Sequence, residues 1–517
     1  MLTSYTLKNY FRSKTNINNL ALLCVLLAGI GILLRDFLAF RSFWLDEAAL
    51  ALNFARSFRE LAEPLGGGQL APILFLFFVK ALTLVFGAKD YVMRIVPLLF
   101  GIGSITFFYL ILKKIFDGFS SILALSIYVL SERIINYSTE FKQYSAEIFF
   151  PLLLFYIFIK IRENRLDIKK SVLLMITGVI ALWFSSTTIV VLPALASILL
   201  VETLNKKRKK EIINFIVIVV FWLASMSALY LFYRLNNSAV LAMNNYWQSA
   251  FMPIFPKNLQ EFLWLPISIR DFFVFVYKID ANLFSADYSI VKNILFLVLF
   301  LFSITCSIKY FKKLHYLIIF TAALFIFSII LSALKIYPFY ERTVLFIAPF
   351  IIILIAFGLF QILLLLFKAH RSLPVIFLIL FFMLPLVVRI YYVIEPPYRS
   401  EIKPVINYYY ENKKNGDLLY VENYYYHQFE FYSDKKQIDF TNDKDYSLLK
   451  KELSGKRVWV IGDIGDIKNQ AQIRNHYKVK TLAEKISERI TIESISNKIR
   501  HFNNPGVEIT LYDFTNQ

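Results

Sequence analysis

The sequence predicts a polytopic α-helical membrane protein with about eleven transmembrane helices, a juxtamembrane helix and a small carboxyl-terminal α/β soluble domain. Three observations predict this class. Hydrophobic residues make up 58% of the 517 residues, where soluble domains average about 45–50%. The mean hydropathy is +0.57, and apolar runs long enough to cross a bilayer alternate with basic loops. The whole sequence has a formal charge of +19. Because its Lys and Arg residues cluster between the apolar runs, we expect a lipid bilayer as partner and no nucleic acid.

Twelve apolar runs are candidates for membrane spans. They lie at about 19–40, 70–86, 91–112, 119–137, 145–160, 171–184, 187–203, 211–233, 291–308, 314–334, 343–367 and 373–393. A basic amino terminus precedes the first run and no small-residue cleavage site follows it, which predicts an uncleaved first helix with a cytoplasmic amino terminus. The pair 171–184 and 187–203 is short for two full spans, but it forms a hairpin and does not change the parity.

The basic loops decide which runs cross the membrane. They contain Lys113–Lys114, Lys160–Lys170, Lys206–Lys210, Lys309–Lys313 and Lys368–Arg371. If every run crosses, all five loops fall outside. That topology conflicts with the tendency of Lys and Arg to collect in cytoplasmic loops. All five fall inside if 70–86 lies on the membrane. A Lys at mid-bilayer costs about 2.5–3.5 kcal/mol, and Lys80 lies near the middle of this run, so we expect 70–86 to be a juxtamembrane helix.

Two domains are expected. Residues 1–394 would form the transmembrane domain, with 41–90 and 234–290 as outer-face loops. Residues 395–517 are polar and contain strand-like runs at Asp417–Val421, Arg457–Ile461 and Val507–Phe514. We expect this part to be an extracytoplasmic α/β domain with a structural or substrate-gating role, on a multi-pass protein of the cytoplasmic (inner) membrane.

The first candidate site is an acidic pair, Asp46 and Glu47, just after the first span. Insertion energetics do not explain two adjacent carboxylates at a membrane surface, which makes them candidates for catalysis. The alternative is a solvated helix start, because acidic residues in the first turn interact favourably with the helix dipole. The spacing alone does not decide between the two.

The second candidate is the polar segment 137–147, wedged between two apolar runs. Glu140, Tyr144 and Glu147 are spaced by four and three residues, so on a helix they would share one face. Ionisable residues at membrane depth point to function. The alternative is an ion pair of Lys142 with Glu140 or Glu147 that only anchors the helix end.

The third candidate lies before a late span and contains Tyr337, Tyr340 and Arg342. The planar guanidinium of Arg binds two phosphate oxygens and stays charged. The alternative is an interfacial Arg paired with Glu341. A fourth segment, Gly66–Pro72, opens the run at 70–86, but its glycines follow no strand and therefore do not form a phosphate-binding fingerprint.

Taken together, these segments resemble those of membrane glycosyltransferases of the GT-C fold. Within that fold the chain is most similar to the family of protein O-mannosyltransferases, the aminoarabinose transferase of lipid A and RgtA/B/C/D-like enzymes. The matching features are Asp46–Glu47, Gln69–Pro72, Glu140–Ser145 and Pro338–Arg342. The layout agrees over most of 19–393, although each motif is short. Glu147 departs from the pattern, which has Asp at that position.

The resemblance implies an inverting transfer of sugar from a polyprenyl-phosphate donor to a glycan, lipid or protein acceptor at the outer face. Such a transfer needs a general base and a place for the leaving phosphate. Asp46 would be the base, Glu47 would position the acceptor, and Glu140 would orient the acceptor or bind a cation. Lys142 and Arg342 would stabilise the phosphate. The other substrate-binding candidates are Gln69, Tyr144, Tyr337 and Tyr340. The carboxylates permit a divalent cation without requiring one, and no other cofactor is expected.

Two other classes remain open. A flippase or transporter of lipid-linked saccharide would have charged residues near mid-membrane and internal repeats, and neither is evident. An O-antigen-type polymerase or ligase would carry its key Arg and His residues in one large late loop. The acidic pair after the first span favours the transferase instead.

Overall fold

The computed structural model describes most of the membrane-embedded part of the chain and parts of the carboxyl-terminal region. The described residues are 15–116, 118–163, 166–206, 208–235, 244–276, 302–303, 305–306, 311–370, 372–379, 387, 400–421, 424–433, 440–441, 457–462, 497–504 and 507–513. They fall into two compact units, which are described separately. The membrane unit comprises the described parts of 1–39, 58–64 and 70–395. The sheet unit comprises those of 40–57, 65–69 and 396–517.

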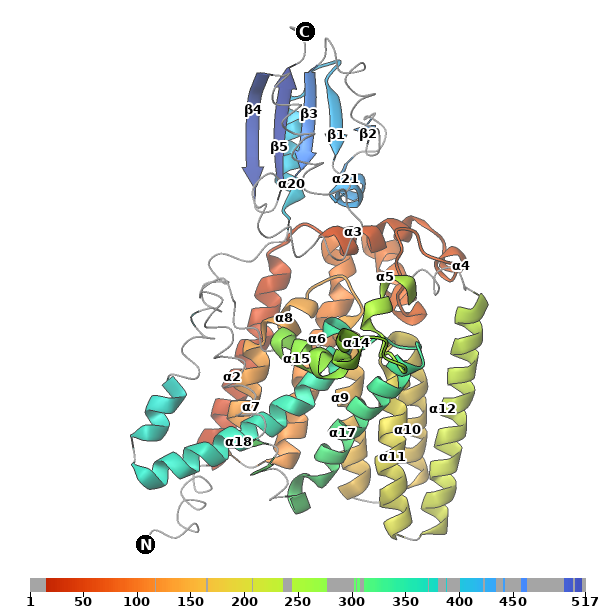
Figure 1. The fold of residues 1–517 in the computed structure, drawn as a ribbon, viewed down its shortest axis with the longest axis vertical. Helices are drawn as coiled ribbons and strands as arrows, with labels where there is room; N and C mark the ends of the chain where they lie inside the picture. The colour runs from red at the N-terminus through yellow and green to blue at the C-terminus, as the bar shows by residue number, and fades with distance from the viewer. Residues whose placement is uncertain are drawn as a thin grey trace. The chain divides into compact units, whose positions relative to one another are not determined.

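The membrane unit is helical throughout its described length (Figure 1). Its α-helices are α2 (Thr15–Leu38), α4 (Phe58–Leu61), α5 (Ile73–Phe86), α6 (Asp90–Ile115), α7 (Phe119–Leu130), α8 (Glu132–Tyr137), α9 (Tyr144–Glu163), α10 (Ile168–Phe184), α11 (Thr188–Lys206), α12 (Lys209–Leu235), α14 (Leu259–Phe262), α15 (Trp264–Val276), α17 (Phe311–Ala333) and α18 (Ala348–Ala369). Two short 3-10 helices are η2 (Gln248–Ala250) and η4 (Glu341–Ile347).

Among the described residues, 7 helices are long and apolar enough to cross a membrane, which confirms a polytopic helical membrane protein. The predicted run at 291–308 and most of that at 373–393 lie outside the described residues, so about eleven spans remains a prediction. Helix α5 has only 14 residues, about 21 Å of helix, which is short for a hydrocarbon core of about 30 Å. Its length agrees with a juxtamembrane position.

Helix α9 lies inside the bundle, whereas α2 and α12 lie at its rim. In the apolar window of α9, 72% of the residues are buried, against 17% in α2 and in α12. Helices α6, α10 and α11 pack against α9, and many Phe side chains fill the spaces between them, as in the stacked pair Phe155–Phe320 at 4.8 Å. A residue at either end of α9 is therefore held by a packed core.

Basic loops gather at one end of the membrane unit. Lys114 Nζ, at the end of α6, donates a hydrogen bond to Glu163 at the end of α9 (3.1 Å). The guanidinium of Arg162 lies 4.3 Å from the ring centroid of Tyr316, near the start of α17. We call this end of the unit the basic end.

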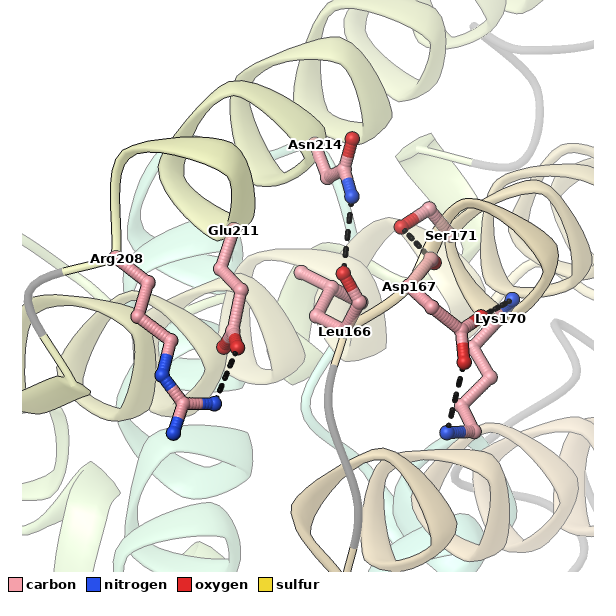
Figure 2. A network of polar contacts seen from close by, with 7 residues as sticks. All are labelled: Leu166, Asp167, Lys170, Ser171, Arg208, Glu211 and Asn214. Carbon is pink, nitrogen blue, oxygen red and sulfur yellow. Dashed lines mark hydrogen bonds and ion pairs between the residues drawn. The ribbon is translucent and has the colours of Figure 1, made fainter.

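The loops after α9 and α11 meet at the same end, and Figure 2 shows their polar contacts. Asn214 Nδ2 on α12 donates to the carbonyl oxygen of Leu166 (2.9 Å). Asp167 caps α10 by accepting a hydrogen bond from the backbone N–H of Lys170 (2.9 Å), the contact that satisfies a free donor of the first helical turn. Three of the five loops predicted from their charge to share one side of the membrane, those at 113–114, 160–170 and 206–210, thus lie at this end of the fold.

The sheet unit contains a mixed five-stranded sheet in the order β2-β1-β3-β5-β4. Its strands are β1 (Leu418–Val421), β2 (Phe440–Thr441), β3 (Arg457–Gly462), β4 (Asn497–Asn504) and β5 (Val507–Asp513). Strand β1 pairs in parallel with β2 and β3, whereas β5 pairs antiparallel with β3 and β4. The three predicted strand-like runs correspond to β1, β3 and β5. Trp459 on β3 is fully buried and donates to Asp417 (2.8 Å).

Four helices complete the sheet unit: α3 (Leu45–Ala51), η1 (Leu52–Ala55), α20 (Ile402–Asn412) and α21 (Tyr426–Tyr432). Helix α21 packs against α3 (Figure 1). Residues 40–57 follow the first span in sequence, yet they form one compact unit with the carboxyl-terminal helices. The acidic pair therefore lies on a short helix that the carboxyl-terminal region supports.

Candidate active site

A tight turn places two of the predicted residues at the start of η4. The hydroxyl of Thr343 donates to the carbonyl oxygen of Pro338 (2.8 Å) and accepts from the backbone N–H of Tyr340 (3.1 Å). The hydroxyl of Tyr337 donates to the carbonyl oxygen of Thr343 (2.8 Å). These bonds fix the backbone on both sides of Tyr340 and Arg342, so the two side chains leave a rigid turn.

Arg342 lies between two aromatic rings from distant parts of the chain. Its guanidinium carbon is 5.7 Å from the ring centroid of Tyr144 and 5.2 Å from that of Trp247. The ring of Trp247 lies 5.5 Å from that of Tyr340. We call these four residues the aromatic–arginine cluster. Stacking on rings orients the plane of a guanidinium, a group whose planar geometry is suited to binding a phosphate or carboxylate.

A second arginine lies close to the cluster. Arg133 on α8 sits 4.7 Å above the ring of Phe275 on α15. The carboxylate of Glu341 interacts electrostatically with both Arg133 and Arg342. Phe275 also packs against Tyr137, which contacts Tyr144 at 4.8 Å. The site thus combines two arginines with the carboxylate of Glu341, and the carboxylates of Asp271 and Glu147 also act on it, Asp271 on Glu341 and Glu147 on Arg342.

The two phenol groups of the site, those of Tyr337 and Tyr340, stay protonated at neutral pH. Burial raises the pKa of Tyr340 to about 12, with a further contribution from the neighbouring Glu341. Burial raises the pKa of Tyr337 well above its usual 10, helped by the charge of Glu147. Both groups remain protonated at neutral pH, so they cannot act as bases there. The Tyr337 hydroxyl donates to the carbonyl oxygen of Thr343, and the Tyr340 hydroxyl is hydrogen-bonded to Glu341.

The turn before α9 is buried and polar. Glu140 is 2% exposed and Lys142 is 5% exposed. The backbone N–H of Lys142 donates to the carbonyl oxygen of Glu140 (2.7 Å), which closes the turn. The prediction that Glu140 shares a helix face with Tyr144 is wrong, because α9 begins at Tyr144 and Glu140 precedes it. A tight turn within 138–143 replaces the helical spacing that the prediction assumed.

The same turn carries polar atoms available to a ligand. The side-chain oxygens of Gln143 and Ser145 are buried, and neither has a hydrogen-bond partner among the described residues. Ser145 has no exposed surface. Buried polar atoms in native proteins are nearly always satisfied, so such atoms beside Tyr144 are consistent with a binding site at this end of α9. Helix α9 is about 30 Å long, which places this site at the end opposite the basic end.

The acidic pair begins α3 in the sheet unit. Glu47 is only 1% exposed and its carboxylate accepts a hydrogen bond from the backbone N–H of Trp44 (3.2 Å). Glu47 therefore closes the first turn of the helix. The acidic pair does lie in the first turn of a helix, as the alternative stated. Glu47 is buried there and not solvated. Asp46 is half-buried.

The glycine segment is tied to the acidic helix. The side chain of Asn53 accepts from the backbone N–H of Gly66 (2.7 Å) and donates to the carbonyl oxygen of Ala49 on α3 (2.9 Å). Gln69 is 9% exposed and donates to the carbonyl oxygen of Gly67 (3.2 Å). Gln69 and the acidic pair thus belong to one hydrogen-bonded substructure, and Gln69 is engaged in holding the turn.

The structure brings the predicted site residues together in two groups. Tyr144, Tyr340 and Arg342 meet in the membrane unit, with Tyr337, Glu140 and Lys142 on the same two segments. Asp46, Glu47 and Gln69 meet in the sheet unit. The two groups belong to different units and are described separately.

Sequence reasoning missed three residues of the membrane-unit group: Arg133, Trp247 and Glu341. Arg133 lay inside an apolar run that was assigned as part of a span. Trp247 lay in the long segment 234–290, whose aromatic content was the only available signal. Glu341 was considered only as a partner of Arg342. Among the described residues, no group of three or more His, Cys, Asp or Glu side chains could hold a metal ion.

Comparisons with known proteins agree with the resemblance expected from the sequence. Residues 71–230 match the family described as dolichyl-phosphate-mannose-protein mannosyltransferase. This match covers α5 to most of α12 and includes Glu140, Lys142 and Tyr144. No curated protein matches the chain.

Solved structures extend the likeness to nearly the whole chain. Apo ArnT from Cupriavidus metallidurans aligns over 95% of this chain and 97% of its own, with a TM-score of 0.50 and 11% identity. ArnT bound to undecaprenyl phosphate aligns over the same shares with a TM-score of 0.48 and 11% identity. AglB from Archaeoglobus fulgidus, an oligosaccharyltransferase in complex with an inhibitory peptide and a dolichol-phosphate, aligns over 95% of this chain and 74% of its own, with a TM-score of 0.48 and 12% identity. The likeness to apo ArnT confirms the GT-C type of fold.

Proposed function

We propose that the chain is a glycosyltransferase that moves a sugar from a polyprenyl-phosphate-linked donor to a hydroxyl group of a glycan, lipid or protein acceptor. The observation that carries this proposal is the aromatic–arginine cluster, an oriented Arg342 at the end of the bundle opposite the basic end. An oriented guanidinium is suited to a phosphate. The matching family and solved structures are those of proteins named for glycosyl transfer or for complexes with polyprenyl phosphates.

The positive charge of the basic end supports one orientation of the protein in the membrane. Lys and Arg collect in cytoplasmic loops, so the basic end would face the cytoplasm and the aromatic–arginine cluster the outer side. The protein would then sit in the cytoplasmic membrane with its carboxyl-terminal domain outside. A lipid-linked donor supplies activated sugar on the side where soluble nucleotide sugars are absent.

The chemistry is a single inverting displacement. Asp46 takes the proton from the acceptor hydroxyl, and the acceptor oxygen attacks the anomeric carbon of the donor. The bond between that carbon and the phosphate oxygen breaks, and the polyprenyl phosphate leaves with the bonding electrons. Arg342 and Lys142 stabilise the charge that develops on the phosphate.

The other residues bind and orient the substrates. Glu47 and Gln69 hold the acceptor side of the site, and Glu140 orients the acceptor or binds a divalent cation. Tyr144, Tyr337 and Tyr340 line the path of the sugar or lipid. Glu140 and Lys142 are both buried.

Sugar transfer by the full-length protein in proteoliposomes tests the proposal. The purified protein is given a panel of polyprenyl-phosphate-linked sugars, each carrying a radiolabelled sugar, and membrane glycans and lipids as acceptors. Asp46→Asn should lower the transfer rate by about a hundredfold or more and leave a residual rate. Glu63→Gln should leave the rate unchanged, because Glu63 is exposed and outside the proposed site. Full activity of Asp46→Asn would show that Asp46 is not the base.

A further inference from the structure

Three successive backbone N–H groups just before the acidic pair are held by side chains. The N–H of Ser42 donates to both carboxylate oxygens of Glu401 (3.1 and 3.0 Å). The N–H of Phe43 donates to the hydroxyl of Tyr432 (2.7 Å). The N–H of Trp44 donates to Glu47 (3.2 Å). Two of the three acceptors come from the carboxyl-terminal helices, more than 350 residues further along the chain, with separations of 359 and 389.

Further contacts hold the same short segment. The hydroxyl of Ser42 donates to Glu401 (2.9 Å), and the side-chain amide of Gln428 donates to the carbonyl oxygen of Phe43 (2.8 Å). The Phe43 side chain is fully buried and lies 6.2 Å from the ring of Tyr432. The segment 42–43 is therefore bound through its backbone donors, one carbonyl and a buried ring.

Phe40, two residues before Ser42, has an unusual backbone conformation. Its φ is +47°, in the left-handed region that non-glycine residues seldom adopt. Lys403, one of the residues on α20, donates a hydrogen bond from its ammonium group to the Phe40 carbonyl oxygen. Such conformations persist where the surrounding structure determines them, and they occur preferentially at functional sites.

We propose that the carboxyl-terminal helices α20 and α21 position Asp46, with Glu401 and Tyr432 as the positioning residues. This inference rests on the proposed function, in which Asp46 is the base. Asp46 lies two residues after Trp44, whose backbone N–H is already bound to Glu47, so fixing Ser42 and Phe43 fixes the first turn of α3. A base must lie within hydrogen-bond reach of the proton that it removes. A displacement of about 1 Å costs about a hundredfold in rate.

The positioning role predicts a specific kinetic pattern in the full-length protein. In Glu401→Ala and in Tyr432→Phe, kcat should fall by about tenfold or more while the KM for the lipid-linked donor stays within about twofold. Combined with Asp46→Asn, neither change should lower the residual rate further, because its effect acts through Asp46. Glu411→Ala on the exposed face of α20 serves as the control and should leave kcat unchanged.

Hydrogen exchange supplies a readout that does not depend on activity. The amides of Ser42 and Phe43 should exchange faster in both variants, because each loses its acceptor. Peptides from α9 should be unaffected. Tyr432→Phe removes one oxygen atom, so it keeps the test available if Glu401→Ala does not fold.

Two results would overturn the inference. One is an unchanged kcat per folded molecule in both variants, and the other is an additional loss when either is combined with Asp46→Asn. If Asp46→Asn alone retains full activity, the proposed base is wrong. Faster exchange at Ser42 and Phe43 in the same experiment would then show that the contacts hold α3 without serving that base.

Discussion

Replacing Arg342 by Lys keeps the positive charge of the aromatic–arginine cluster and removes its planar geometry. The guanidinium carbon is 5.2 Å from the ring centroid of Trp247 and 5.7 Å from that of Tyr144. Both distances lie within the range of about 6 Å in which a cation and a ring attract each other, by about 0.5–2 kcal/mol. A flexible ammonium group has no fork with which to bind two phosphate oxygens.

The expected loss follows from these contacts. One hydrogen bond to a charged group contributes about 1.5–3 kcal/mol, and Lys retains part of the phosphate attraction. The transition state should therefore lose about 1–3 kcal/mol, which corresponds to a fall in kcat/KM of about 5-fold to 150-fold. Arg342→Ala should lose more, because it also removes the charge.

The assay is the rate of sugar transfer from a polyprenyl-phosphate donor, measured over a range of donor concentrations in proteoliposomes. Arg270→Lys is the matched control, because Arg270 is 63% exposed and pairs with Asp271 at the surface. Trp247→Leu should lower kcat/KM in the native background and have a smaller effect in Arg342→Lys, since its ring acts through the guanidinium. A value of kcat/KM for Arg342→Lys within about twofold of the native value would refute this role of Arg342.

Two further predictions concern the sheet unit. Gly67→Ala should destabilise the sheet unit by about 1–2 kcal/mol, because Gly67 has φ +66° and an added Cβ would lie 3.2 Å from the Cβ of Ala49. Gly68→Ala should cost less, because Gly68 has φ +63° but open space around an added Cβ. Thermal unfolding of the two variants would contradict this account if their order were reversed. Burial lowers the pKa of His427 below 6.5, partly offset by Glu430, so the unfolded state binds more protons just below pH 6.5 and stability should fall as the pH drops through that range. His427→Gln should flatten this part of the pH profile, and an unchanged profile would assign it to another group.

The sequence was sufficient to predict the helical membrane class and the main strands of the carboxyl-terminal sheet. Long apolar runs have one physical solution in a bilayer, because each backbone N–H and C=O must be satisfied within the helix. Strands β1, β3 and β5 were predicted from short runs of β-branched and aromatic residues. Strand β4 was missed because Asn497–Asn504 is polar and contains Arg500 and His501, a composition that resembles a loop.

The candidate site could be predicted only in pieces. Charge and composition marked Arg342 and Tyr144, since each lies in a polar segment beside a span. The contacts of Arg342 with Tyr144 and Trp247 join segments far apart in the sequence, which no local pattern records. The same limit applies to Ser42 and Glu401, whose hydrogen bonds join segments 359 residues apart. The spacing of Glu140 and Tyr144 suggested one helix face, but Glu140 lies in a tight turn that precedes α9.

The central claim is that the acidic pair and the aromatic–arginine cluster act on the same side of the membrane, opposite the basic end. The most direct measurement is labelling of single cysteines by a membrane-impermeant thiol reagent in intact cells, in a background where Cys24 and Cys306 are replaced. Exposed positions are available at Phe40 and Ile336, which are 48% and 56% exposed, and at Lys169 in the first turn of α10, at the basic end.

The account predicts that cysteines at 40 and 336 are labelled from outside and that a cysteine at 169 is labelled only after the membrane is permeabilised. Labelling of 40 and 336 from opposite sides would contradict it, because no single active site could then contain both Asp46 and Arg342.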